Sequence, residues 1–291
     1  MRTKHKIEFF IFNSFANLFR VIGLNRTRRS TKYLAFVLYY LIPVRKNVVI
    51  SNLKTALPQK SDSEIEKLAL QTYQNILITF FELMYLPSAK EEEVQSSIVI
   101  DNLEEIQKIV GANKAAIILT GHFGGWEFCM SSLSLKFGRE ISLLAQPQSN
   151  PGVSDYVMLA RAKFGNKIIL SGISIRKIYE TIKSGGIIGI AGDQRGHYEG
   201  PRFNFFGKST ALYTGAASIA IKTNCPVIMT AFERQKDYSY KMHLEELNCD
   251  NLPHENEEKI RVLTQRYITF LEKHIRKNPD QYFWMHKIWK Y

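Results

Sequence analysis

Residues 115–130 read "AAIILTGHFGGWEFCM", an apolar run followed by a histidine, a glycine pair and a stretch that mixes apolar and polar residues. The run "AAIILT" is short and rich in β-branched residues, which predicts a buried strand. Residues 126–137 are predicted to form a helix, so that "GHFGG" becomes the turn between the two. A strand covered on both faces and followed by a helix is the repeating unit of α/β sheets.

The same alternation continues from residue 97 to residue 232. Strands are predicted at "SIVI" (97–100), "AAIILT" (115–120), "ISLLAQ" (141–146), "NKIIL" (166–170), "GIIGIAG" (186–192) and "CPVIMTAF" (225–232). Helices are predicted around 102–111, 126–137, 153–164, 174–184 and 211–223. This pattern predicts the α/β class, with a mostly parallel or mixed sheet flanked by helices and functional loops at the strand ends.

Before residue 97, helices are predicted over residues 7–24 and 61–86. In residues 7–24, Asn13, Asn17 and Arg20 fall in one sector at 100° per residue, which indicates an amphipathic helix. Residues 33–44 are uninterruptedly apolar but number only 12, short of the roughly 20 that a membrane-spanning helix needs. Residues 61–86 begin with "SDSE", a helix-start pattern. We therefore divide the chain into a membrane-associating region, 1–45, and a single domain, 46–291; the alternative for 1–45 is two ordinary core helices.

Composition narrows the class of partner and the compartment. The formal net charge of +12 favours anionic partners. Basic residues crowd the first fifty positions among long apolar runs, which is typical of a membrane surface and not of nucleic-acid binding. The three cysteines have neither paired spacing nor an even count, which indicates a reducing, cytosolic compartment without a cysteine-rich zinc site. A cleaved signal peptide fits poorly.

His122 and Glu127 are the candidate catalytic pair. The glycines between them let the chain bend, so that the carboxylate can fold back onto the imidazole. Glu127 would then hold one ring nitrogen protonated and leave the other free to accept a proton, as in acyl-transfer enzymes. In the alternative, His122 is a strand-end histidine satisfied by backbone groups and Glu127 is a solvated charge near a helix N-terminus.

These residues resemble those of a known family. "GHFGGWE" is similar to the His-x4-Asp/Glu signature of the lysophospholipid and glycerolipid acyltransferases, and nearly the whole chain resembles the late acyltransferases of lipid A biosynthesis, of the lauroyl/myristoyl type. The other similar segments are "RKNVVISNLKTALP", "SNPGVSDYVMLARAKFGNKII", "IAGDQRG", "FNFFGKSTALYTGAASIAIKTNCPVI" and "NPDQYFWMHKIWKY". Several weak motifs in the same order are together specific.

The resemblance implies a single glycerolipid-acyltransferase-like domain that moves a fatty acyl group from an acyl-carrier-protein thioester to a hydroxyl of a membrane glycolipid, a lipid A precursor. His122 would be the general base on that hydroxyl and Glu127 its orienting partner. Arg161 would contact a substrate phosphate or the oxyanion. Asp193, Gln194 and Arg195 follow the strand 186–192, where they would organise the acceptor headgroup; in the alternative, the Asp193 side chain stabilises a turn. His197 and His286 are not assigned to the site.

We expect the enzyme to act at the cytoplasmic face of the inner membrane, without a cofactor. The sequence shows no metal cluster with ligand spacing, and "SGGIIG" and "GHFGG" match neither a P-loop nor G-x-G-x-x-G, so a metal-independent reaction is expected. Nucleic-acid binding is disfavoured because no reader motif is present. Two enzymatic alternatives stay open. The acceptor can be an aminolipid or another lysolipid, or the same His/Glu pair can serve a thioesterase or lipid hydrolase in which water replaces the acceptor hydroxyl.

Overall fold

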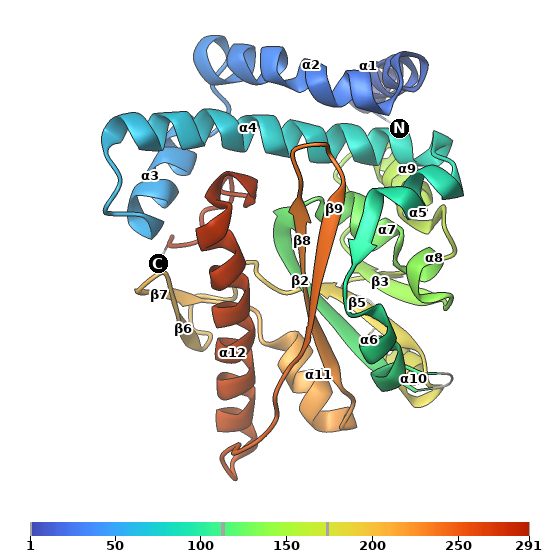
Figure 1. Cartoon of the computed structure of the whole chain (residues 1–291), viewed down its shortest axis with the longest axis vertical. Coiled ribbons are helices and arrows are strands. Elements are labelled where there is room, and N and C mark those ends of the chain that lie inside the picture. Colours follow the sequence, from blue (N-terminus) through green and yellow to red (C-terminus); the bar gives the residue numbers. More distant parts are fainter. Residues whose placement is uncertain (1, 112–113, 173–174, 291) are drawn as a thin grey trace.

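A computed structural model describes residues 2–111, 114–172 and 175–290 of the chain. Among them, seven strands form one sheet in the order β1-β9-β8-β2-β5-β3-β4, and β6 and β7 form a separate two-stranded sheet (Figure 1). Neighbours in the large sheet are parallel except β8 and β9. The strands are β1 (Ile98–Ile100), β2 (Ala116–Gly124), β3 (Ile141–Ala145), β4 (Lys167–Leu170), β5 (Ile187–Ala191), β6 (Arg202–Phe205), β7 (Lys208–Ala211), β8 (Val227–Arg234) and β9 (Tyr240–Glu246). The predicted α/β class and mostly parallel sheet are confirmed.

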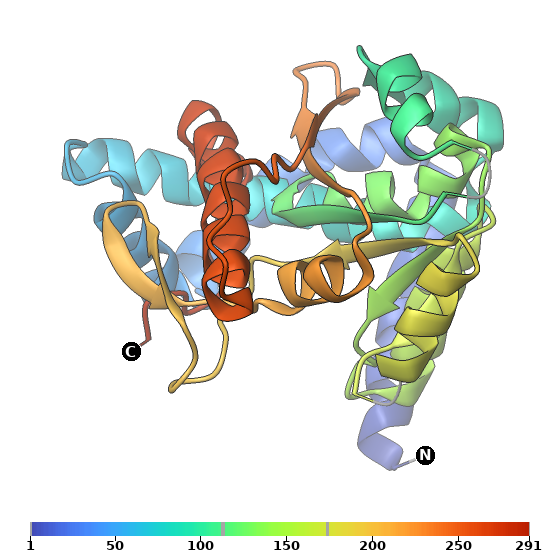
Figure 2. The ribbon, with the colours of Figure 1, turned by 90° about the horizontal axis from the view of Figure 1, so that it is seen from below.

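Helices cover both faces of the sheet (Figure 2). The helices are α1 (Thr3–Ile22), α2 (Leu24–Phe36), α3 (Lys46–Ala56), α4 (Asp62–Tyr85), α5 (Glu91–Ser97), α6 (Leu103–Ile109), α7 (Trp126–Ser131), α8 (Leu133–Phe137), α9 (Pro151–Ala162), α10 (Ile175–Lys183), α11 (Gly215–Thr223) and α12 (Asn256–Lys277). One core packs α10, α11 and α12 against Ile117 and Ile188. The other packs α5 to α9 against Ile118 and Ile187, the neighbouring residues of the same strands. Alternating side chains of one strand therefore enter two cores, as expected for a strand that is covered on both faces.

The helix α4 runs across the end of the sheet at which β2 and β8 finish, and α1 and α2 lie on its outer side (Figure 1). It begins at the predicted capping box, in which Ser61 and Glu64 each accept a hydrogen bond from the other's backbone. Each predicted strand is present. The predicted helix 126–137 is divided at Ser132 into α7 and α8.

The N-terminal region is helical, with two differences from the prediction. The helix expected over 7–24 ends at Ile22, because Gly23 has φ +84° and turns the chain into α2. The apolar stretch 33–44 does not share one environment, since Tyr39 is fully buried in the protein whereas Leu41 and Ile42 are exposed. Among the described residues, no single helix is both long enough and apolar enough to cross a membrane. The consecutive segments Leu24–Leu41 and Lys46–Ala56, bent by 99° relative to each other, reach that length and apolar composition only when they are taken together.

Candidate active site

Strand register brings His122 beside Asp193. β2 and β5 pair in parallel with Ala116 opposite Ile187 and Thr120 opposite Ala191. Two further residues along each strand bring the chain to His122 and Asp193, so these side chains leave adjacent strands at the same edge. The Asp193 carboxylate accepts two hydrogen bonds from His122, one from the backbone N–H at 2.8 Å and one from ring Nδ1 at 2.6 Å.

The glycine pair of the turn is required by close contacts. Gly124 has φ +60°, and a Cβ there would lie 1.5 Å from the carbonyl oxygen of Phe232 on β8. A Cβ at Gly125 would lie 2.2 Å from the ring of Tyr240. The turn therefore rests directly on β8 and β9, and a side chain at either position would lift it away.

One ring nitrogen of His122 is hydrogen-bonded to Asp193, and the other can accept a proton. Because a carboxylate can only accept, Nδ1 carries the proton in the contact with Asp193, and Nε2 is left as an acceptor. The side-chain amide nitrogen of Gln194 lies 3.3 Å from Nε2. Burial lowers the pKa of His122, but the charge and hydrogen bond of Asp193, with a smaller contribution from Glu127, together raise it above the ordinary value of 6.5.

Aromatic side chains and the C-terminal segment enclose the imidazole. Trp126 and Phe283 lie with ring centroids 5.4 and 6.1 Å from that of His122. The backbone N–H of Phe283 donates to the carbonyl of His122 at 3.0 Å. With these neighbours, the His122 side chain keeps 18% of its surface exposed, so a substrate group can still reach it.

Glu127 has a different partner from the one predicted. Among the described residues it makes no hydrogen bond to His122; both its oxygens accept from Arg161, from Nε at 2.9 Å and from Nη2 at 2.6 Å. The reason is that Glu127 belongs to α7, which faces α9, whereas His122 belongs to the sheet edge. Burial raises the pKa of Glu127, but Arg161 outweighs it and the pKa is lowered. The orienting contact on the imidazole thus comes from Asp193, which we had assigned to the headgroup.

Basic side chains gather around the segment 283–288, next to the imidazole. Arg195 donates from its backbone to Nε2 of His286 at 3.4 Å and from Nη1 to the carbonyl of Lys287 at 2.8 Å. Arg45, at the start of α3, donates to the carbonyl of Met285 at 3.0 Å. Burial and then Arg195 lower the pKa of His286, with further contributions from the charges of His122 and Arg45. His286, which the sequence analysis left out of the site, therefore borders it.

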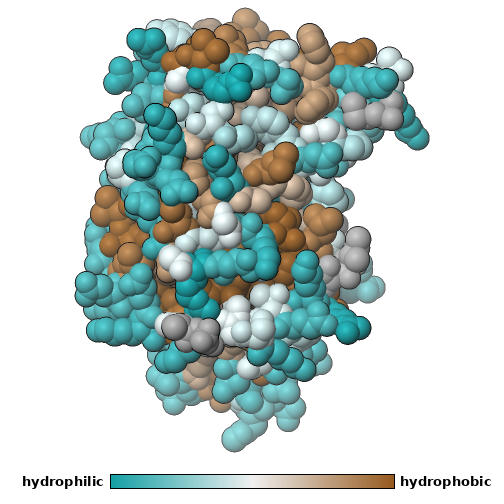
Figure 3. Space-filling view, turned by 90° about the vertical axis from the view of Figure 1, so that its right-hand side faces the viewer, coloured by the Kyte–Doolittle hydropathy of each residue, from teal (hydrophilic) through white to brown (hydrophobic). Residues whose placement is uncertain are grey.

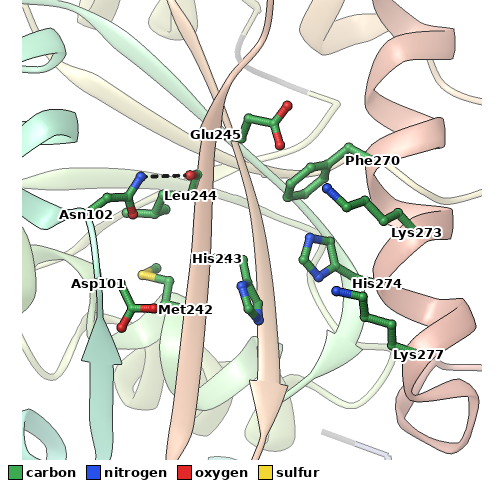
Figure 4. Close-up of a pocket in the computed structure, with 10 residues that line it drawn as sticks. All are labelled: Asp101, Asn102, Met242, His243, Leu244, Glu245, Phe270, Lys273, His274 and Lys277. Carbon is green, nitrogen blue, oxygen red and sulfur yellow. Dashed lines mark hydrogen bonds between the residues drawn. The ribbon is translucent and has the colours of Figure 1, made fainter.

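Two hollows lie away from these residues. One, of about 290 Å³, is lined by Asp101, Met242, His243, His274, Lys273 and Lys277 among others, with His243 and His274 side by side (Figure 4). The other, of about 480 Å³, lies along α12 beside Leu247 and Phe270. Neither is lined by His122 or Asp193. Within the described part of the chain, no three His, Cys, Asp or Glu side chains converge as metal ligands would.

Comparisons with known proteins identify the family of the chain. The chain is 21% identical over 255 residues to a lipid A biosynthesis palmitoleoyltransferase of Escherichia coli (strain K12), covering 84% of this chain and 79% of that protein. It has the same identity and coverage to a lipid A biosynthesis acyltransferase of Shigella flexneri. The model of the family described as bacterial lipid A biosynthesis acyltransferase matches residues 1–291. The chain belongs to the bacterial lipid A biosynthesis acyltransferases and is an acyltransferase.

Proposed function

We propose that this acyltransferase moves a fatty acyl chain from an acyl-carrier-protein thioester to a hydroxyl of a lipid A precursor, at the cytoplasmic face of the inner membrane. The observation that carries the proposal is the 2.6 Å contact between Nδ1 of His122 and Asp193, which leaves Nε2 as a base at a partly exposed position. The formal net charge of +12 suits an acidic carrier protein and an anionic membrane surface.

The reaction begins with the acceptor hydroxyl at Nε2 of His122, in the place that the Gln194 amide occupies. Nε2 takes the hydroxyl proton while the oxygen attacks the thioester carbon. The carbon–sulfur bond of the tetrahedral intermediate then breaks, and the leaving thiolate takes the proton from the imidazolium. Asp193 keeps the proton on Nδ1 throughout and stabilises the positive charge of the ring.

Glu127 and Arg161 act on the base through their charges, which change the pKa of the His122 ring. Glu127 contributes to the raised pKa of His122, and Arg161 opposes that contribution. Since Nε and Nη2 of Arg161 are engaged by Glu127, we assign Arg161 first to holding this carboxylate. Contact of Arg161 with a substrate phosphate or the oxyanion stays a prediction.

The acceptor headgroup would lie against the two arginines that contact the 283–288 segment. Arg195 and Arg45 come from elements far apart in the sequence and meet the same short segment. Arg45 follows directly after the exposed residues Leu41, Ile42 and Val44. A lipid with its acyl chains beside these three residues would place its polar group near the two arginines and the imidazole.

The exposed apolar face of α1 supports membrane attachment. Its members are Ile7, Phe10, Ile11, Phe15, Leu18, Val21 and Ile22, and Phe10 and Val21 are 71% and 81% exposed. The opposite face packs on the protein through Ala16 and Phe19. Figure 3 shows apolar side chains along the upper edge of the molecule, at the height of α1 in Figure 1. An apolar stripe of this kind lies in the lipid interface and keeps the helix parallel to it.

The test is a reconstituted transfer with purified protein, an acyl-carrier thioester and a lipid A precursor that lacks one secondary acyl chain. The expected result is a precursor heavier by one acyl chain, with free fatty acid released only slowly when the precursor is left out. Release of fatty acid at the same rate with and without the precursor would overturn the proposal in favour of a hydrolase. Transfer to an aminolipid or lysolipid in preference to the precursor would overturn the acceptor.

A further inference from the structure

A buried network of charged side chains lies behind the turn that carries His122. Glu82 of α4 is fully buried; it accepts from Nε of Arg28 on α2 at 2.8 Å and from the phenol of Tyr240 on β9 at 2.5 and 2.6 Å. Nε of Arg234, at the end of β8, donates to the Tyr240 oxygen at 2.9 Å, and its Nη2 lies 3.5 Å from Glu82. Four elements thus share one carboxylate.

We expect this network to contribute little net free energy to the stability of the fold. Two guanidinium groups with 4% and 3% exposed side chains share a single carboxylate. Taking such charges out of water costs about as much as their attraction returns, and well-packed apolar residues often serve as well. What a buried ion pair can supply is a unique arrangement of the elements that hold it.

The network reaches the catalytic turn through Thr79. Nη2 of Arg234 donates to Oγ1 of Thr79 at 2.9 Å and lies 3.5 Å from the carbonyl oxygen of Gly124. The single proton of the Thr79 hydroxyl has two acceptors within reach, the carbonyl of Gly124 at 3.0 Å and that of Asn75, one turn earlier on α4, at 3.1 Å. Gly125, the next residue, rests on the ring of Tyr240, whose hydroxyl Glu82 holds. The network therefore bonds the turn at one residue and supports the next, between His122 and Glu127.

We propose that the Arg28–Glu82–Arg234–Tyr240 network is a positioning device for the catalytic base, and that the Thr79 hydroxyl is the link through which it fixes the 121–127 turn. Thr79 and the four network residues are positioning residues, since none contacts the His122 ring. One of them, Arg28, lies in the N-terminal region assigned to the membrane. The kinetic consequence rests on the proposed function; the position of His122 does not.

The decisive variants are Thr79→Val and Thr79→Ser. Valine keeps the shape of threonine but removes the hydroxyl, whereas serine keeps the hydroxyl. The matched control is Thr72→Val, two turns earlier on α4: Thr72 is also fully buried, and its hydroxyl has no hydrogen-bond partner among the described residues. Thermal unfolding of all three gives the folded fraction by which rates are divided.

In the transfer assay, Thr79→Val is expected to lower kcat by about tenfold to a hundredfold with little change in KM, because a shift of about 1 Å in a reacting group costs up to a hundredfold. Thr79→Ser should recover most of the rate, and Thr72→Val should keep it. Equal rates in Thr79→Val and Thr72→Val, or an equal loss in Thr79→Val and Thr79→Ser, would overturn the proposal.

A second measurement works even if the transferred group or acceptor has been misidentified. In protein labelled with ¹⁵N at histidine, with the His122 signals assigned from His122→Ala, the imidazole is titrated by NMR. Thr79→Val should move the His122 pKa toward that of an ordinary imidazole, since the contact with Asp193 loosens, and Thr72→Val should not. A His122 titration that is the same in both valine variants refutes the positioning role whatever the reaction.

Discussion

Asp193→Asn is the substitution that tests the base most directly. The carboxylate accepts from the His122 backbone N–H with one oxygen and from Nδ1 with the other. Asparagine has the same shape but only one oxygen. If that oxygen stays on the backbone N–H, the amide NH2 faces Nδ1 and donates to it, which moves the ring proton to Nε2. The nitrogen that faces the acceptor hydroxyl can then no longer take its proton.

The expected magnitude follows from the loss of a positioned base. General bases contribute about 10² to 10⁴ in rate, and a wrong histidine tautomer in serine proteases costs about 10⁴. We expect kcat/KM to fall by about 10³, which is about 4 kcal/mol of transition-state stabilisation.

The pH profile gives an independent signature. Burial lowers the His122 pKa, but Asp193 and Glu127 together raise it above 6.5, so wild-type activity should fall as pH decreases through a value above 6.5. Without the negative charge at 193, burial prevails and the remaining activity should persist to lower pH. The measurement is kcat/KM from pH 5 to 9. Glu127→Gln is compared alongside because Glu127 raises the His122 pKa without a hydrogen bond to the ring, so its loss should move the acid limb less than the loss of Asp193. An Asp193→Asn enzyme with the wild-type rate and acid limb, beside a Glu127→Gln enzyme that has lost both, would refute Asp193 as the orienting group.

Four further predictions concern the base, its supporting ion pair, the membrane face and acid stability. His122→Ala should lower transfer by about 10² to 10⁴ in a folded protein, measured as acylated product per minute. Arg161→Ala leaves Glu127 buried without its partner and should lower stability by about 3 to 5 kcal/mol, whereas Arg161→Met with Glu127→Gln should recover part of the loss in urea unfolding. Replacing Phe10, Phe15 and Leu18 by serine should weaken vesicle binding roughly a hundredfold at about 1 kcal/mol each, while Val99→Ser, an exposed apolar residue on β1, should not. His274, beside His243 in the hollow of Figure 4, has a pKa lowered to about 4, first by burial and then by His243. The unfolded chain binds a proton near 6.5, so stability should fall between pH 6.5 and 4 by about 2 kcal/mol after solvent screening, and His274→Gln should flatten that fall.

The sequence was most informative where a strand is buried on both faces. Runs such as "AAIILT" and "GIIGIAG" have a composition that few other structures accept, and β2 and β5 appear within a residue or two of the predicted bounds, except that β2 continues through the turn to Gly124. The antiparallel strand β9 was missed because it contains no apolar run: in "YKMHLEE" the buried Tyr240, Met242 and Leu244 alternate with Lys241 and His243 on the other face. The hairpin β6–β7 was missed for a related reason, since each strand has only four residues.

The structure brings the candidate site residues together but pairs them differently from the prediction. His122, Glu127, Arg161, Asp193, Gln194 and Arg195 lie around one strand edge, but the pairing of the carboxylates differs. Spacing along the chain favours partners that are near in sequence, whereas Asp193 is 71 residues from His122. The signal that could have found it is register, because "AIILT" aligned with "IIGIA" as parallel neighbours brings His122 opposite Asp193.

The buried network that includes Arg28 also changes how the N-terminal region has to be tested. Removal of residues 1–45 was the natural experiment for a membrane anchor, but it would take away Arg28, whose loss leaves Glu82 and Arg234 in a buried network without one of its charges. It would also uncover Tyr73, against which Tyr39 packs at 5.2 Å. A truncated enzyme would lose activity whether or not α1 binds lipid, because the catalytic turn and the anchor share a support. Only substitutions on the exposed face of α1, which leave Ala16, Phe19 and Arg28 in place, separate attachment to the membrane from the arrangement of the base.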